Sequence, residues 1–222
     1  MTGLADEATE RVRAAYQNAG YFKADVSAKA LPVAKTPKPR YDIEIDVLEP
    51  GKQYRLGDFH FLHATVFPEQ QLRDLFPQQR GEIFSREKVA KGLEGLRDLY
   101  GSQGYVNFTA VPNPVFDESN ASVGLEIDID EGKLFHWGNL HITGMRDQDA
   151  QSLLQAWAGV QGTPYTPDDL TLPRFLGKFF RPLRKGTSVS DYTTAKVDEN
   201  TGTVDIYLNL TLNPDLLKSM GK

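Results

Sequence analysis

The chain has 222 residues, of which 40% are apolar and 25% are charged, a balance typical of a folded globular protein. Its formal net charge is −5, whereas a general nucleic-acid binder would carry the opposite sign. Cysteine is absent, which excludes a disulfide framework, a thiolate zinc site and a cysteine nucleophile. No apolar run reaches the roughly 18 residues that a membrane-spanning helix needs, and the first residues lack the pattern of a signal peptide.

The N-terminal part predicts one helix and two strands. Residues 4–19 favour a helix, and Gly20 is followed by a segment that reads as a strand. Ile43, Ile45 and Val47 then alternate with acidic residues, which indicates a second strand with one buried face.

The middle part begins with an alternating strand at residues 54–61. Pro68 suits the first turn of a short helix, and Ser85 is a candidate N-cap for a longer one. Gly104 stands where a left-handed cap would end that longer helix. The apolar stripe of the long helix consists of Val89, Leu93, Leu96 and Tyr100. Gly92 and Gly95 interrupt this helix, so we expect another backbone to approach closely there.

The middle part ends with two further strands. Residues 105–111 read as the first of these, and the turn-forming run at 117–120 follows it. Residues 123–129 then alternate between apolar and polar or acidic residues, as in a strand with one wet face. The element order is therefore β-α-α-β-β.

The last part repeats this order. We expect a strand at residues 135–142, a helix at 147–157 and a final strand at 204–210. The second helix has a buried stripe formed by Leu172, Phe175, Phe179 and Leu183. A basic face, formed by Arg174, Lys178, Arg181 and Lys185, lies opposite. We read it as a solvated surface in preference to a contact with anionic lipid or an acidic partner.

Self-similarity explains why the order recurs. The run from Gly51 to Phe61 matches the run beginning at Gly132 at an offset of 81 residues, with both glycines, a lysine and a histidine in register. The phrase Tyr-x-x-x-Gly-Tyr, which ends at Tyr21, returns at Tyr105. We therefore predict an N-terminally truncated unit at 1–52, complete units at 53–133 and 134–213, and a tail at 214–222. The missing start of the first unit suggests a piece of a longer protein.

Motifs of enzyme chemistry are missing from the sequence. The histidines at 60 and 63, and those at 136 and 141, have spacings that place each pair on opposite faces of a strand. No nucleophile elbow, zinc-protease, phosphate-loop or dinucleotide-binding motif is present. We read the acidic alternations as solvated strand faces. The sequence thus predicts a protein that is not an enzyme and has no cofactor or metal.

The unit order, the phrase that runs from Leu96 to Val106 and the junction that runs from Ile127 to Met145 resemble the POTRA (polypeptide-transport-associated) repeat. The resemblance implies an α+β fold of tandem modules, each a three-stranded mixed sheet covered on one face by two helices. In that family the repeats lie in the periplasm of Gram-negative bacteria, before an outer-membrane β-barrel. It therefore implies part of a barrel-assembly or translocation protein of the BamA/TamA type.

An unpaired sheet edge offers N–H and C=O groups to an extended chain, which adds as another strand. In the family the second strand of the unit lies at such an edge. The resemblance thus implies a docking scaffold for unfolded outer-membrane clients or accessory proteins. The candidate backbone positions are Tyr105, Val106, Asn107, Phe108, Thr109, Ala110 and Val111, and Tyr21, Phe22, Lys23, Ala24, Asp25 and Val26.

Two alternatives stay open. The repeats of a two-partner secretion transporter, or of a cell-division protein, would serve one dedicated partner. The repeats of a hydrolase–barrel fusion would accompany an enzyme while being inert themselves. The tyrosines and glycines of the repeated phrase are read as caps and packing residues before client contacts.

Overall fold

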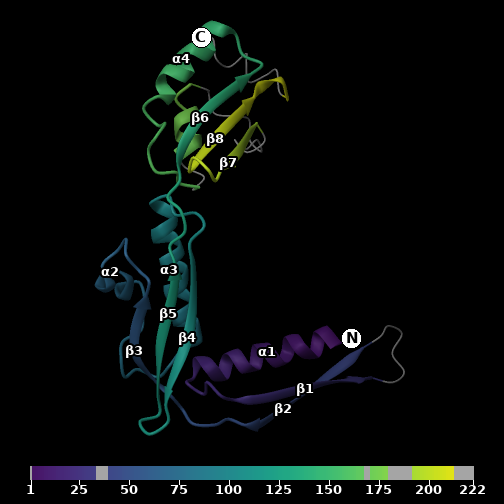
Figure 1. Cartoon of the computed structure of the whole chain (residues 1–222). Helices are drawn as coiled ribbons and strands as arrows, with labels where there is room; N and C mark the ends of the chain where they lie inside the picture. Colours follow the sequence, from purple (N-terminus) through teal and green to yellow (C-terminus); the bar gives the residue numbers. More distant parts are fainter. Residues whose placement is uncertain (1, 34–39, 168–170, 180–191, 213–222) are drawn as a thin grey trace. The chain divides into compact units, whose positions relative to one another are not determined.

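The structure is a computed structural model, and it describes residues 2–33, 40–167, 171–179 and 192–212 (Figure 1). The chain divides into two compact units. The first comprises Met1–Leu96 and Ala110–Asp130, and the second comprises Arg97–Thr109 and Glu131–Lys222. Within the described ranges, no helix is both long enough and apolar enough to cross a membrane.

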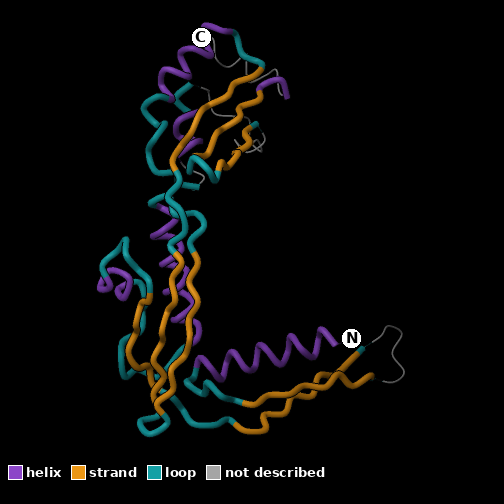
Figure 2. The backbone as a smooth tube through the Cα atoms, viewed as in Figure 1, coloured by secondary structure: helices purple, strands orange, loops and turns teal. Residues whose placement is uncertain are grey.

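The first sheet has two antiparallel strands, β1 (Asp25–Pro32) and β2 (Tyr41–Glu49), as Figure 2 shows. Helix α1 (Thr2–Asn18) packs mainly on β1, where Val26 is buried. On β2, by contrast, Ile43 and Ile45 remain 36% and 39% exposed. The predicted helix and alternating strand are confirmed, and the apolar face of β2 is only partly covered.

The middle sheet belongs to the first compact unit for most of its length. Its elements are β3 (Arg55–Leu62), α2 (Glu69–Asp74), α3 (Arg86–Ser102), β4 (Thr109–Asp117) and β5 (Ser122–Asp130). The strand order is β3-β5-β4, with β5 in the centre and parallel to β3. The alternating side chains of β5 are at most 3% exposed, namely Val123, Leu125, Ile127 and Ile129. The predicted β-α-α-β-β order is confirmed.

Two glycines of α3 make room for side chains. A Cβ on Gly92 would lie 2.1 Å from Cδ1 of Phe76, and one on Gly95 would lie 3.3 Å from Cβ of Leu75. The expectation that a backbone approaches here is therefore wrong, because the close neighbours are side chains just after α2. The predicted N-cap is confirmed, since Oγ of Ser85 accepts the N–H of Lys88 at 3.4 Å.

The last sheet has the same topology. Its elements are β6 (His136–Thr143), α4 (Asp147–Trp157), α5 (Thr171–Leu176), β7 (Thr193–Asp198) and β8 (Thr203–Asn209), and a 3-10 turn follows at Leu210–Leu212. The strand order is β6-β8-β7, with β8 parallel to β6 and antiparallel to β7. Trp157 is 2% exposed, and its indole N–H donates to the carbonyl of Gly138 at 2.9 Å. The predicted α+β fold of repeated modules is confirmed.

The sequence-based unit boundaries stay a prediction. The positions chosen near 52 and 133 fall between β2 and β3 and between β5 and β6. Part of the last predicted helix, with Arg181, Leu183 and Lys185, lies outside the described residues, as does the tail at 214–222. Leu172, Arg174 and Phe175 lie in α5 as expected.

Candidate functional site

The first strand of each three-stranded sheet has its outer edge partly covered by the chain itself. The N–H of Leu56 donates to Glu82 and its carbonyl accepts from Gly81, both at 2.8 Å. In the last sheet, the N–H of Trp137 donates to Thr163 at 2.9 Å and its carbonyl accepts from Gly162 at 2.8 Å. An equivalent short loop thus covers part of the outer edge of β3 in one sheet and of β6 in the other.

The opposite edges are formed by β4 and β7, each with one neighbouring strand in the described part of the chain. In the first sheet β1 occupies the corresponding position beside β2. These three strands are the second strands of their units, so the sequence-based expectation that this strand lies at an edge agrees with the topology. The backbone of these edges is the candidate functional site.

The predicted docking segment of the middle unit begins too early. Tyr105, Val106, Asn107 and Phe108 precede β4, and only Thr109, Ala110 and Val111 lie in the strand. The N–H of Phe108 donates to Tyr105 at 3.2 Å in a turn. The ring of Phe108 is 8% exposed and stacks on Tyr100 at 4.2 Å between centroids. These four residues are held by the core, which is why they do not extend the edge.

The segment predicted in the first unit has the same error. Tyr21, Phe22, Lys23 and Ala24 precede β1, and only Asp25 and Val26 are in the strand. The N–H of Ala24 donates to Tyr21 at 3.2 Å, and the ring of Phe22 lies 5.0 Å from those of Phe84 and Phe116. Aromatic packing against the middle unit, not strand pairing, fixes these residues.

A helix cap explains the repeated Tyr-x-x-x-Gly-Tyr phrase. The N–H of Tyr21 donates to Tyr16 at 2.9 Å and the N–H of Gly20 donates to Gln17 at 3.2 Å, the two bonds of a Schellman cap. The tyrosine rings that flank the cap lie 5.9 Å apart. The second copy of the phrase forms the same pair of bonds, from Tyr105 to Tyr100 and from Gly104 to Gly101. The interpretation of these residues as caps and packing residues agrees with this geometry.

A polar cluster joins the segment just before β1 to the middle sheet. The carboxylate of Glu118 accepts from the hydroxyl of Tyr54 at 2.9 and 3.0 Å and pairs with the ammonium of Lys23. Lys23 also lies over the ring of Phe116, 4.3 Å from its centroid. The hydrogen bond from Lys23, followed by that from Tyr54, lowers the pKa of Glu118 below 4.5, and the hydrogen bond to Glu118 raises the pKa of Lys23.

This cluster predicts a measurable titration. Because the pKa of Glu118 is depressed in the folded state, its contribution to stability is present above the unfolded value and is lost as the pH falls through the folded one. A ¹³C-detected titration of the carboxyl group should give a midpoint below 4.5. The variant Lys23→Met should move that midpoint up, whereas Lys91→Met, which removes the partner of Glu87, should leave it unchanged. A Glu118 midpoint that is the same in Lys23→Met as in the wild type would contradict the assignment of the ion pair.

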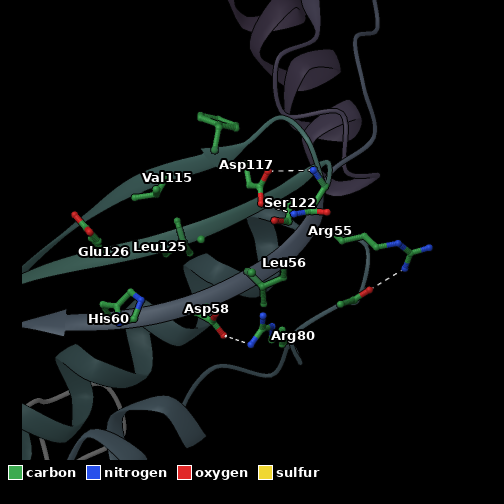
Figure 3. Close-up of a pocket in the computed structure, with 15 residues that line it drawn as sticks. Arg55, Leu56, Asp58, His60, Arg80, Val115, Asp117, Ser122, Leu125 and Glu126 are labelled. Atoms are coloured by element: carbon green, nitrogen blue, oxygen red, sulfur yellow. Dashed lines mark hydrogen bonds and ion pairs between the residues drawn. The ribbon is translucent and has the colours of Figure 1, made fainter.

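A hollow of about 490 Å³ lies on the face of the middle sheet, between β3, β5 and the end of β4 (Figure 3). The guanidinium of Arg80 pairs with Asp58 at 3.0 Å, and that of Arg55 donates to the carbonyl of Gly81 at 2.8 Å. The Asp117 carboxylate accepts from the Asn120 side chain and backbone, and these bonds lower its pKa. Both arginines, Asp58 and Asp117 thus already have partners within the chain.

The last sheet fills the equivalent position with a side chain. Both sheets have an irregular step in the parallel pairing, after Leu56 in one and after Trp137 in the other. In the last sheet the carboxylate of Asp205 accepts the N–H of Asn139 at 2.7 Å. The residue that corresponds to Asp205 at the 81-residue offset is Gly124. Asp205 thus places a carboxylate where the middle sheet has a glycine, and the residues that line the hollow offer no paired nucleophile and base.

Two of the four histidines each pair with a single carboxylate. Nδ1 of His63 lies 2.7 Å from Oδ1 of Asp128, and Nε2 of His141 lies 3.2 Å from Oδ2 of Asp205. Burial would raise the pKa of Asp205, but the hydrogen bonds from Asn139 and His141 outweigh it and lower that pKa. Within the described residues, no group of three or more His, Cys, Asp or Glu side chains is arranged to hold a metal ion.

Comparison with known proteins places this geometry in a family. The model of the POTRA family, described as a surface antigen variable number repeat, matches residues 54–132. The middle unit is therefore identified as a POTRA repeat. The matched segment contains β3 to β5, so the complete middle unit is the part that the family model covers.

Two curated relatives are outer membrane protein assembly factors named BamA. That of Buchnera aphidicola is 23% identical over 193 residues, which is 85% of this chain and 31% of the relative. That of Neisseria meningitidis is 25% identical over 149 residues, which is 63% of this chain and 18% of the relative. The chain thus spans less than a third of the length of either relative.

A solved structure shares the fold. The crystal structure of POTRA repeats 3–5 of Haemophilus influenzae BamA superposes with a TM-score of 0.59 and 19% identity, covering 92% of this chain and 78% of that one. The tandem POTRA fold inferred from the repeated phrases is therefore confirmed.

Proposed function

We propose that this chain is the periplasmic POTRA region of a BamA-type outer-membrane protein in a Gram-negative bacterium. It acts as a non-enzymatic scaffold that binds client polypeptides or accessory proteins of outer-membrane assembly. The proposal is supported by the two relatives named as outer membrane protein assembly factors. The single structural observation that carries it is the set of outer strands that pair on one side only in the described part of the chain.

The binding mode is β-augmentation, in which an extended segment of the client adds to an outer strand. Backbone hydrogen bonds supply most of the affinity and tolerate many side chains, which suits clients of varied sequence. The outer strand of the first sheet, β1, is the primary candidate, and it includes the predicted positions Asp25 and Val26. Its backbone runs for eight residues beside β2, and Leu31 near its end is 46% exposed.

The other edge of the two-stranded sheet belongs to β2, and the topology of the chain argues against it. In the two complete sheets the last strand of the unit, β5 or β8, lies in the centre and has a parallel neighbour. The second edge of β2 thus corresponds to a position that is paired in both other sheets. The outer edge of β1 corresponds to an edge that has no strand neighbour in the described part of either complete sheet.

The test is backbone chemical-shift mapping of the chain with an extended peptide from an outer-membrane barrel strand. We expect shifts at alternate amides of β1, because a docked strand bonds to every second residue of an edge. Two matched peptides sharpen the test, each N-methylated at alternate residues. The peptide whose methyl groups lie on the edge that bonds to β1 should lose binding. The peptide whose methyl groups lie on its other edge should keep binding.

The outcomes separate the modes of binding. Equal effects of the two N-methylated peptides, or shifts confined to helices, would refute β-augmentation. Shifts along β2 instead of β1 would refute the choice of edge.

A further inference from the structure

The outer strand of the middle sheet carries two prolines inside its length. Pro112 and Pro114 lie within β4, which runs from Thr109 to Asp117. A proline nitrogen has no hydrogen to donate, and in sheets proline is confined to edge strands, with the nitrogen facing away from the neighbour. β4 is such an edge, because its one neighbour in the described sheet is β5.

The spacing of the prolines fixes which backbone groups they remove. β4 and β5 are joined by a turn of four residues, so the two strands form an antiparallel hairpin. In such a strand every second residue points its N–H and C=O to the same side. Pro112 and Pro114 therefore share the open side with Ala110 and Phe116. Two of these four consecutive donor positions lack a hydrogen.

The side chains of β4 show why this edge needs protection. Val111 is 56% exposed and Val115 is 49% exposed. A nine-residue edge with exposed apolar side chains is a template for unwanted strand pairing, and proline on the edge is one of the ways in which proteins prevent it.

We infer that Pro112 and Pro114 close the β4 edge to incoming strands and so act as specificity-determining residues that direct strand docking to other outer edges. β1 has one proline, at its last residue Pro32, and β7 has none. This inference rests on the proposed function for the choice of client. The closure of β4 itself follows from the backbone alone.

The experiment restores the two donors with the variant Pro112→Thr/Pro114→Thr, in the full chain. The probes are the extended barrel-strand peptide and the chain itself, studied by sedimentation velocity. We expect the variant to self-associate, or to bind the peptide at β4 at least about tenfold more tightly than the wild type does there, because the two restored bonds together contribute about that factor. The matched control, Val111→Thr/Val115→Thr, changes exposed side chains of the same strand and restores no donor. This control should neither self-associate nor bind the peptide more tightly at β4.

A folded double variant that stays monomeric and binds no peptide at β4 would overturn the inference. The two single variants serve as independent tests if the double variant does not fold, and each should show part of the gain. Failure of the proposed function can be told apart from failure of this inference. In the former case, the wild-type chain would bind no peptide at β1. The gain of self-association at β4 would still be measured in the variant.

Discussion

The variant Gly92→Ala is expected to lower the free energy of unfolding by about 2 kcal/mol. Alanine gains about 1 kcal/mol over glycine in a helix interior, so the propensity alone predicts stabilisation. The added Cβ, however, would lie 2.1 to 2.4 Å from three ring atoms of Phe76, which is 2% exposed. Overpacking of this kind typically costs about 1–3 kcal/mol, and the depth of the overlap places this position at the upper end. Urea unfolding followed by far-UV circular dichroism measures the change.

The same helix provides a matched control. A Cβ on Gly101 would meet no atom within 4 Å, so Gly101→Ala should raise the free energy of unfolding by up to about 1 kcal/mol. The two substitutions are chemically identical and should act in opposite directions. In a Phe76→Leu background the cost of Gly92→Ala should shrink, because the ring that it displaces is gone. Two glycine variants that shift stability equally would show that Phe76 is not the obstacle.

Periodicity was sufficient to predict most helices and strands of this fold. The helix at Asp147–Trp157 has acidic residues in its first turn and buries Leu153 and Trp157, and its bounds agree with the prediction. The alternation of β5 predicts both the strand and its buried face. Such elements are predictable because one strong signal, the spacing of apolar residues, coincides with the burial that stabilises them.

The start of the outer strands could not be predicted in this way. Tyr105 and Phe108 have a high preference for strands, but the Schellman cap and the stacking on Tyr100 use them in the core before the strand begins. The spacing of the Tyr-x-x-x-Gly-Tyr phrase carries the signal, because a cap of this type joins residues five apart. The tertiary contact then overrides the local preference of the aromatic residues.

The role of the two prolines also required the strand bounds. With the strand placed at 105–111, Pro112 and Pro114 lie beyond its end. With β4 running to Asp117, they lie inside an edge and change what that edge binds. The Pro-x-Pro spacing was visible in the sequence and is the signal that would have identified β4 as an edge strand.

Gly20 is expected to be the most sensitive position of the link between the first sheet and the middle one. Its φ of +87° is in the left-handed region, where an alanine costs about 1–2 kcal/mol. A Cβ there would also lie 2.7 Å from Cγ2 of Ile83 and 2.9 Å from the carbonyl of Tyr54. The Gly20 carbonyl accepts the N–H of Tyr54 at 2.8 Å, so movement of this residue breaks the hydrogen bond that begins the middle unit.

Gly20→Ala should therefore destabilise the chain by about 2–5 kcal/mol, the sum of the backbone cost and the overlap. Hydrogen exchange at the Tyr54 amide should accelerate, because its acceptor is displaced. Gly3→Ala is the control, since Gly3 lies inside α1 where a Cβ meets no atom within 4 Å, and this variant should leave that amide protected. An unchanged Tyr54 amide in a folded Gly20→Ala variant would mean that the aromatic contacts of Phe22 and the Glu118 cluster hold the two sheets together without the cap. If the cap is required and the proposed docking at β1 occurs, loss of peptide binding in this variant should accompany the loss of protection, because the proposed docking edge would no longer be held beside the middle sheet.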